Sequence, residues 1–175
     1  MVNGLSDSNG FAPIVSQQAK ALILGTMPSV ASLLKQQYYG HPRNAFWPIM
    51  AALFGADIEF DYQQRKEILI GNGIAVWDVL QYCRRPGSLD ANIDMTSIKI
   101  NDFEYFFAHY PLITRLFFNG STAEKMYRCH VLSELNNRFP YLEYRRLPST
   151  SPAYASLGLA QKIEAWQVIK ESMIK

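Results

Sequence analysis

Short apolar runs alternate with helix-like segments along the chain. The run at 21–24 is bounded by turn signals, which is typical of a strand buried in a parallel sheet, and strands are predicted at 20–24, 74–80, 112–118 and 141–147. Apolar spacing and capping residues predict helices at 29–37, 45–54, 62–72 and 122–135, one that ends at His109, and a last one at about 158–174. Strand, loop and helix therefore follow one another four times. This order predicts an α/β fold, a parallel sheet with helices on both faces and right-handed crossovers.

Two stretches lack such a pattern. Residues 1–13 are predicted to be a polar lead-in to the first strand. Residues 81–100 contain the sequence RRPGS and alternating small polar residues, and we predict a long loop there that acts as a lid or binding surface. A chain of 175 residues is long enough to bury a real core, and we expect one domain over 1–175.

Parallel strands end at the same edge of a sheet, where open α/β folds place their ligands. Three loops are expected to meet there: 25–47 (the first loop), 119–122, and 148–156 (the last loop), with 81–97 beside them. The first loop holds a polar and aromatic cluster, YYGHPRN, followed by Phe46 and Trp47, and it has no carboxylate. Its polar candidates are Thr26, Ser29, His41, Arg43 and Asn44.

Several of these side chains allow two interpretations. Asn44 can orient a water molecule or a substrate through its amide, or cap the helix that follows. His41 can titrate or donate, or only bind the loop backbone. Asn119 suits a nucleobase edge, or is a turn residue before Gly120. Phe46 can stack on a planar base, or belong to the core.

The last loop places three hydroxyl-bearing residues between two prolines. Such a stiff polar segment, with free backbone N–H groups, suits phosphate contacts. The three residues are Ser149, Thr150 and Ser151.

Composition and missing motifs exclude several classes. The chain is 49% hydrophobic and 18% charged, which favours a folded domain. It has no apolar run of about 18 residues and no signal-peptide pattern, so we expect an intracellular protein. Two cysteines without a CxxC pair and three scattered histidines predict no metal site. The absence of GxGxxG, GxxxxGK[ST] and GxSxG disfavours dinucleotide binding, P-loop binding and serine hydrolase chemistry.

The formal net charge of +2 is too small to indicate nucleic-acid binding by itself. It is compatible with a local basic patch, or with an ordinary solvated surface. The candidates for such a patch are Arg43, Arg84, Arg85, Arg145 and Arg146.

Five segments together resemble a known group of enzymes. GTMPSVASL, YYGHPRNAFWPI, GIAVWDVL, FFNGSTA and LPSTSPAYA resemble the uracil-DNA glycosylase superfamily, and within it the DNA-deoxyinosine (hypoxanthine-DNA) glycosylase family. They occur in the family's order and span about 20–158. The resemblance implies a three-layer α/β/α sandwich with a central four-stranded parallel sheet and no cofactor. It also implies hydrolysis of the bond between a damaged base and deoxyribose, after the nucleotide is flipped out of DNA and water attacks C1′.

The resemblance also implies roles for individual residues. Asn44 would position the attacking water, with His41 as a second catalytic candidate. Phe46 would stack on the flipped base and Asn119 would contact its edge. Ser149, Thr150 and Ser151 would grip the phosphate backbone, and Gly25, Thr26 and Met27 would line the water side of the site with backbone groups.

The chain departs from typical members of the superfamily at two places. Those members carry Asp or Asn after the first-loop glycine and a histidine opening the last motif, where this chain has Thr26-Met27 and Leu147-Pro148. These departures are expected for the deoxyinosine branch. Lys35 is the one lysine in the three loops, so no Schiff-base lyase step is expected.

The residues leave two alternative functions open. One is a glycosylase specific for uracil or mismatches, and the other is a non-catalytic α/β module that binds nucleotides or DNA. We expect a cytoplasmic monomer that acts on DNA and does not bind membranes.

Overall fold

A four-stranded sheet forms the centre of the computed structural model, which describes residues 7–174. Its strands are β2 (Ala21–Gly25), β3 (Ile74–Asp78), β6 (Arg115–Asn119) and β7 (Glu143–Leu147), in the order β3-β2-β6-β7. Every neighbouring pair is parallel, which confirms the predicted sheet. The register places Gly25 of β2 opposite Asp78 of β3.

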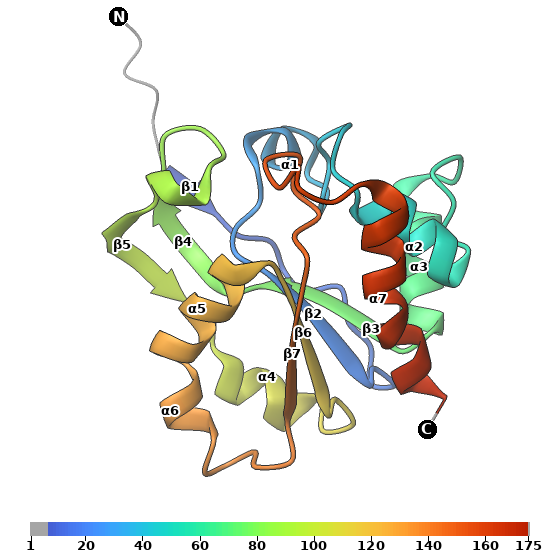
Figure 1. Ribbon diagram of the computed structural model, residues 1–175. Helices are drawn as coiled ribbons and strands as arrows, with labels where there is room; N and C mark the ends of the chain where they lie inside the picture. Colours follow the sequence, from blue (N-terminus) through green and yellow to red (C-terminus); the bar gives the residue numbers. More distant parts are fainter. Residues whose placement is uncertain (1–6, 175) are drawn as a thin grey trace, which may run out of the picture.

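Helices cover both faces of this sheet. They are α1 (Val30–Lys35), α2 (Phe46–Phe54), α3 (Tyr62–Gly71), α4 (Phe103–His109), α5 (Ser121–His130), α6 (Leu132–Leu135) and α7 (Leu159–Met173). α2, α3 and α7 lie on one side of the sheet, and α4, α5 and α6 on the other (Figure 1). All residues of β2 and β3 are buried, as expected for strands covered on both faces. Within 7–174, no helix has the length and apolar character to cross a membrane.

Local chemistry sets the helix ends largely as predicted. The Ser29 side chain accepts a hydrogen bond from the Ser32 amide and starts α1. Gly55 adopts a left-handed conformation, with φ of 74°, and ends α2. The helix predicted over 122–135 is instead two helices, because the chain leaves helical geometry at Val131, where φ is −124°.

A second sheet overturns two predictions. β1 (Asp7–Asn9), β4 (Leu80–Arg84) and β5 (Asp94–Ile100) form a three-stranded antiparallel sheet in the order β1-β4-β5. The predicted long loop over 81–100 is therefore wrong, as is the polar lead-in at 7–9; residues 1–6 lie outside the described part of the chain. The strand predicted over 74–80 contains β3, and its last residue, Leu80, is the first residue of β4.

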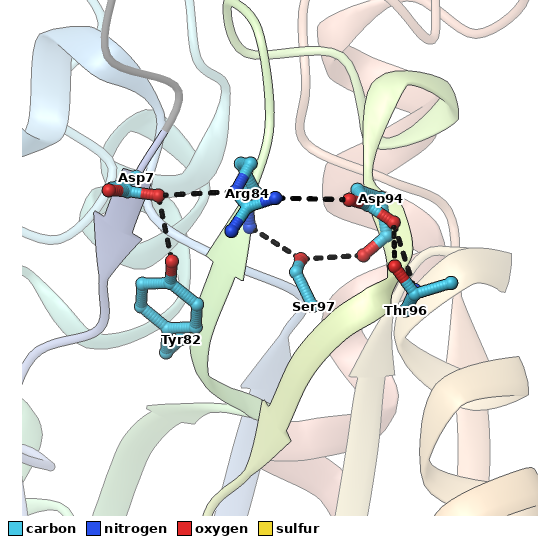
Figure 2. A network of polar contacts seen from close by, with 6 residues as sticks. All are labelled: Asp7, Tyr82, Arg84, Asp94, Thr96 and Ser97. Atoms are coloured by element: carbon cyan, nitrogen blue, oxygen red, sulfur yellow. Dashed lines mark hydrogen bonds and ion pairs between the residues drawn. The ribbon is translucent and has the colours of Figure 1, made fainter.

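Polar side chains add contacts between the three strands of this second sheet, beside its backbone pairing. Figure 2 shows Arg84 between Asp7 and Asp94, with nitrogen–oxygen distances of 3.5 and 3.8 Å. The Tyr82 hydroxyl donates to Asp7, and the Arg84 amide donates to the Ser97 hydroxyl. The sheet also has apolar contacts with the core, because Leu80 and Cys83 are buried and Ile98 and Ile100 pack against the core. Arg84 is engaged with two carboxylates and is therefore a weak candidate for a basic patch.

Candidate active site

The carboxyl ends of the parallel strands open into a cleft of about 370 Å³. Three predicted loops contribute to it: the first loop, 119–122 and the last loop. The segment 88–91, between β4 and β5, flanks it as expected. The residues that line the cleft are Gly25, Thr26, Met27, Pro28, Ser29, Ser32, Tyr38, Tyr39, Asn44, Asp78, Ser88, Leu89, Asp90, Ala91, Asn119, Gly120, Ser121, Thr122, Ser149, Thr150, Ser151, Ala153 and Tyr154.

Eight of the predicted site residues are among them. They are Gly25, Thr26, Met27, Asn44, Asn119, Ser149, Thr150 and Ser151. The structure therefore brings together the glycine-containing exit of β2, the amide at the end of the first loop, and the two segments after β6 and β7.

Asn44 lines the cleft and lies directly before Ala45, the N-cap residue of α2. Its Oδ1 accepts a hydrogen bond of 2.9 Å from the backbone amide of Phe46, and its backbone N–H donates to the His41 carbonyl. The first of these bonds uses the carboxamide oxygen and not the NH₂ group. Asn44 is therefore not the expected N-cap, but its contact with the first residue of α2 is compatible with a role in the cleft.

The structure corrects the expected position of Phe46. Its side chain is fully buried, and its ring stacks on Tyr39 with centroids 3.9 Å apart. Because Tyr39 lines the cleft and Phe46 does not, Tyr39 presents the aromatic face that a base would meet. Sequence reasoning missed Tyr39 because a Tyr-Tyr pair in a loop does not reveal which ring faces the cleft. Its φ of 54° is rare for a residue with a side chain.

His41 is not brought to the cleft either. It is half-buried, and its Nδ1 accepts a hydrogen bond of 3.1 Å from the amide of Arg43. This contact matches the interpretation of His41 as a loop residue bound to backbone.

Asn119 and Thr150 bind each other reciprocally. The Asn119 Nδ2 donates to the Thr150 hydroxyl and the Thr150 amide donates to Asn119 Oδ1, both at 2.9 Å. The Thr150 carbonyl also accepts from the amide of Ala45. This buried pair therefore ties β6 and the last loop to the start of α2. A carboxamide has two N–H groups and two lone pairs on its oxygen, so one of each is still available to a ligand.

Close approach of the backbone is what brings the last loop to β6. Gly120 has φ of +94°, and a Cβ there would lie 3.0 Å from the Ser149 Cβ. Thr150 is only 1% exposed, whereas Ser149 and Ser151 are half-buried. The two serines are therefore the hydroxyls that phosphate groups can reach.

A carboxylate that the sequence analysis did not consider lies at the cleft. Asp78 ends β3 opposite Gly25 and is 4% exposed. A Cβ on Gly25 would lie 2.5 Å from Asp78 Oδ1 and 3.0 Å from the Tyr39 hydroxyl. Within residues 7–174, neither Asp78 Oδ2 nor the Tyr39 hydroxyl has a hydrogen-bond partner. The signal that could have revealed Asp78 is an acidic residue at the carboxyl end of a fully apolar strand.

Two more charged residues surround Asp78. Arg85 is 2% exposed, forms an ion pair of 3.4 Å with Asp90 and donates to the Pro28 carbonyl. Burial raises the pKa of Asp78 to about 7; the Asp90 charge adds to this rise and Arg85 opposes it. The pKa of Asp90 is also raised, chiefly by burial. Arg85 is thus part of a buried cluster and not of a surface patch.

Three comparisons relate this chain to known proteins. A family model described as the uracil DNA glycosylase superfamily matches residues 12–170. Two curated proteins named hypoxanthine DNA glycosylase, from Methanosarcina barkeri and Methanosarcina acetivorans, are 38% and 36% identical over 115 residues, covering 65% of this chain and 72% of each relative. The solution NMR structure of a Methanosarcina acetivorans protein, assigned as a candidate uracil DNA glycosylase, has a TM-score of 0.77 and 29% identity, covering 97% of this chain and 99% of that one.

Proposed function

Since the chain belongs to the uracil DNA glycosylase superfamily, we propose that it is a monofunctional DNA glycosylase that removes deaminated bases, hypoxanthine foremost, from DNA. The enzyme hydrolyses the N-glycosidic bond and leaves an abasic site. The observation that best supports this is the meeting of Asn44, Tyr39 and Asn119 around one cleft at the carboxyl edge of the sheet. The names of the two relatives support hypoxanthine as the base.

The shape of the cleft agrees with base flipping. A space of about 370 Å³ suits one nucleobase and not a duplex, so the base must leave the stack to enter. The Tyr39 ring offers a flat surface for that base. Ser149 and Ser151, at the rim, would bind the flanking phosphates, and exposed Arg43 in the first loop would add a positive charge.

Asn44 is proposed to orient the attacking water. A carboxamide does not remove a proton at neutral pH, so its contribution is the position of the water relative to C1′. The backbone of Thr26 and Met27 would line the same side of the cleft. No lysine is among the described residues that line the cleft, which supports direct hydrolysis without a Schiff-base step.

Asn119 is proposed to bind the base edge. Hypoxanthine presents the O6 acceptor beside the N1–H donor, which matches the remaining donor and acceptor of the Asn119 amide. Uracil presents O4 beside N3–H in the same arrangement. Asn119 alone can therefore bind either base. An experiment has to distinguish a hypoxanthine-specific enzyme from the alternative, a uracil-specific one.

The test is a base-release panel. Single- and double-stranded oligonucleotides that contain hypoxanthine, uracil or xanthine are incubated with the protein, and free base and abasic sites are quantified. We expect release of hypoxanthine to be fastest. Preferential release of uracil would favour the alternative enzyme, and binding without release of any base would favour a non-catalytic DNA-binding module.

Variants of Asn44 separate chemistry from folding. Asn44→Ala removes both the proposed water contact and the acceptor for the Phe46 amide, whereas Asn44→Ser keeps an acceptor for that amide. Both variants should lose most base release, but only the alanine variant should also lose about 1 kcal/mol of unfolding free energy. Asn137→Ala, at an exposed position beyond α6, is the matched control and should keep full activity. Full activity in Asn44→Ser would contradict the proposed role.

The proposal includes a monomer that works on DNA in the cytoplasm. Sedimentation of the protein alone and with an oligonucleotide containing hypoxanthine should give one protein molecule per site. A stable dimer in both samples would contradict the monomer.

A further inference from the structure

The cleft has a carboxyl group at its floor, that of Asp78, which takes part in neither the proposed water contact nor the proposed base contact. Asp78 is 4% exposed and yet lines the cleft. Its Oδ2 has no hydrogen-bond partner among residues 7–174, although a buried carboxyl oxygen normally has one. Because Asp78 itself lines the cleft, its carboxyl group is placed to contact a ligand that enters the cleft.

The depth of Asp78 decides which part of the nucleotide it can meet. A flipped nucleotide stays attached to the DNA backbone, so its sugar remains near the mouth and the base reaches the floor. Asp78 lies against Gly25 and near the Tyr39 hydroxyl, and both residues border the part of the cleft where the base would stack. Asn44, the proposed water ligand, is half-buried rather than at the floor. Asp78 is therefore placed to contact the base and not the attacking water.

We propose that Asp78 is a catalytic general acid that donates its proton to the leaving base while the glycosidic bond breaks. The acceptor is on the O6/N7 edge of hypoxanthine. This inference rests on the proposed glycosylase function and adds the group that neutralises the departing base. Asn119, a neutral amide, can only stabilise that charge by hydrogen bonding.

The proton and electron balance of the step is complete. The C1′–N9 bond breaks with its electron pair going to the base, and the Asp78 proton moves to the O6/N7 edge. The water oxygen bonds to C1′ and releases one proton. That proton restores the Asp78 carboxyl through solvent once the base has left, so the net reaction is hydrolysis without another reactant.

Burial raises the pKa of Asp78 and so keeps a proton on it near neutral pH; the Asp90 charge adds to this rise and Arg85 opposes it. The groups that face it are Asp90 and Arg85 from the β4–β5 connection, and Tyr38 and Tyr39 from the first loop. Burial raises the pKa of both tyrosines far above its usual value, so they remain neutral. With the pKa of Asp78 at about 7, a large share of the carboxyl is protonated in the physiological range.

The test measures kcat/KM for hypoxanthine release between pH 5.5 and 9. In the unmodified protein the rate should fall about tenfold per pH unit above a midpoint near 7. Asp78→Asn, which keeps the shape but cannot transfer a proton, should release base about 100-fold more slowly or worse, and without this alkaline fall. Its affinity for the DNA should be almost unchanged. Asp7→Asn, the same substitution in the second sheet, is the matched control and should keep the original rate and profile.

Asp90→Asn provides a second and independent readout. Removing the Asp90 charge, and leaving Arg85 without its partner, both favour ionisation of Asp78, so the midpoint should move to lower pH. Titration of the base itself would not respond to this substitution. The Asp90 result and the profile of the unmodified protein test the proposal even if Asp78→Asn does not fold.

The outcomes separate the two proposals. A rate that rises with pH through 7 would make Asp78 a general base and overturn the inference, as would an Asp78→Asn variant with the original rate and profile. Either result leaves the glycosylase function intact. If the unmodified protein releases no base from any oligonucleotide, the glycosylase function fails and the acid role fails with it.

Discussion

Replacing Asp78 with asparagine should stabilise the protein at alkaline pH while it removes activity. The carboxyl is 4% exposed, and its pKa is raised from 3.8 to about 7, mainly by burial. The folded state therefore holds this proton more tightly than the unfolded state. Between the two pKa values the unfolded chain has lost the proton and the folded chain has not, so stability falls as pH rises.

The size of this effect follows from the two pKa values. For pKa values of 3.8 and about 7, the contribution of this group to the unfolding free energy decreases by about 2.5–3 kcal/mol between pH 5 and pH 8. Asparagine has the same shape and does not ionise. The difference in stability between Asp78→Asn and the unmodified protein should thus grow in favour of the variant by about 2.5–3 kcal/mol over that range.

Urea unfolding at pH 5, 6, 7 and 8, followed by circular dichroism, measures this difference directly. Other titrating groups are common to both proteins and cancel in the comparison. Asp90→Asn should reduce the pH dependence, because it lowers the pKa of Asp78. A gap between variant and unmodified protein that is constant from pH 5 to 8, or that shrinks, would refute a buried carboxyl with a raised pKa.

Two further substitutions test the packing that supports the cleft. Thr150→Val keeps the side-chain shape but leaves the Asn119 amide without its buried acceptor. It should lower the unfolding free energy, measured in urea, by about 1–3 kcal/mol and slow base release. The control Thr96→Val, at an exposed position, should change the unfolding free energy by less than about 0.5 kcal/mol. Equal losses in the two variants would contradict the buried pair. Phe46→Ala should cost about 3–5 kcal/mol, because the ring is fully buried beneath Tyr39, and Phe60→Ala, which is 41% exposed, serves as its control. A small loss at Phe46, with activity lost, would instead support the direct base contact first expected for it.

The central sheet could be predicted because its signal is local. β2 and β3 are apolar runs with both faces buried, and Ser29 starts α1 while Gly55 ends α2. β7 is the exception, because its charged residues leave it mostly exposed. The second sheet could not be predicted, because its strands gain their contacts across long sequence separations. The ion pairs of Arg84 with Asp7 and Asp94 join three segments, and nothing in the local pattern of any one segment indicates the other two.

The sequence predicts which loops form the candidate site, but not which of their side chains are buried and which reach the cleft. The sequence places Tyr39 and Phe46 in the same short loop, and only packing shows that one covers the other. Thr150 is in a stretch of hydroxyl residues, and only the fold shows that it is buried against Asn119 while its neighbours reach the rim. How deeply a side chain is buried depends on how the loops pack together, so residue spacing along the chain does not predict it.

The first loop lacks a carboxylate, yet the cleft does not. Parallel pairing of β2 with β3 sets Gly25 directly opposite Asp78, and any larger residue at 25 would place its Cβ 2.5 Å from the carboxyl oxygen. The missing side chain at Gly25 is therefore what allows the Asp78 carboxyl to border the cavity. Because the same burial makes that carboxyl costly to ionise, the protonated form that the proposed reaction requires is also the form that the fold stabilises. A strand register, rather than a motif in one loop, supplies the acid.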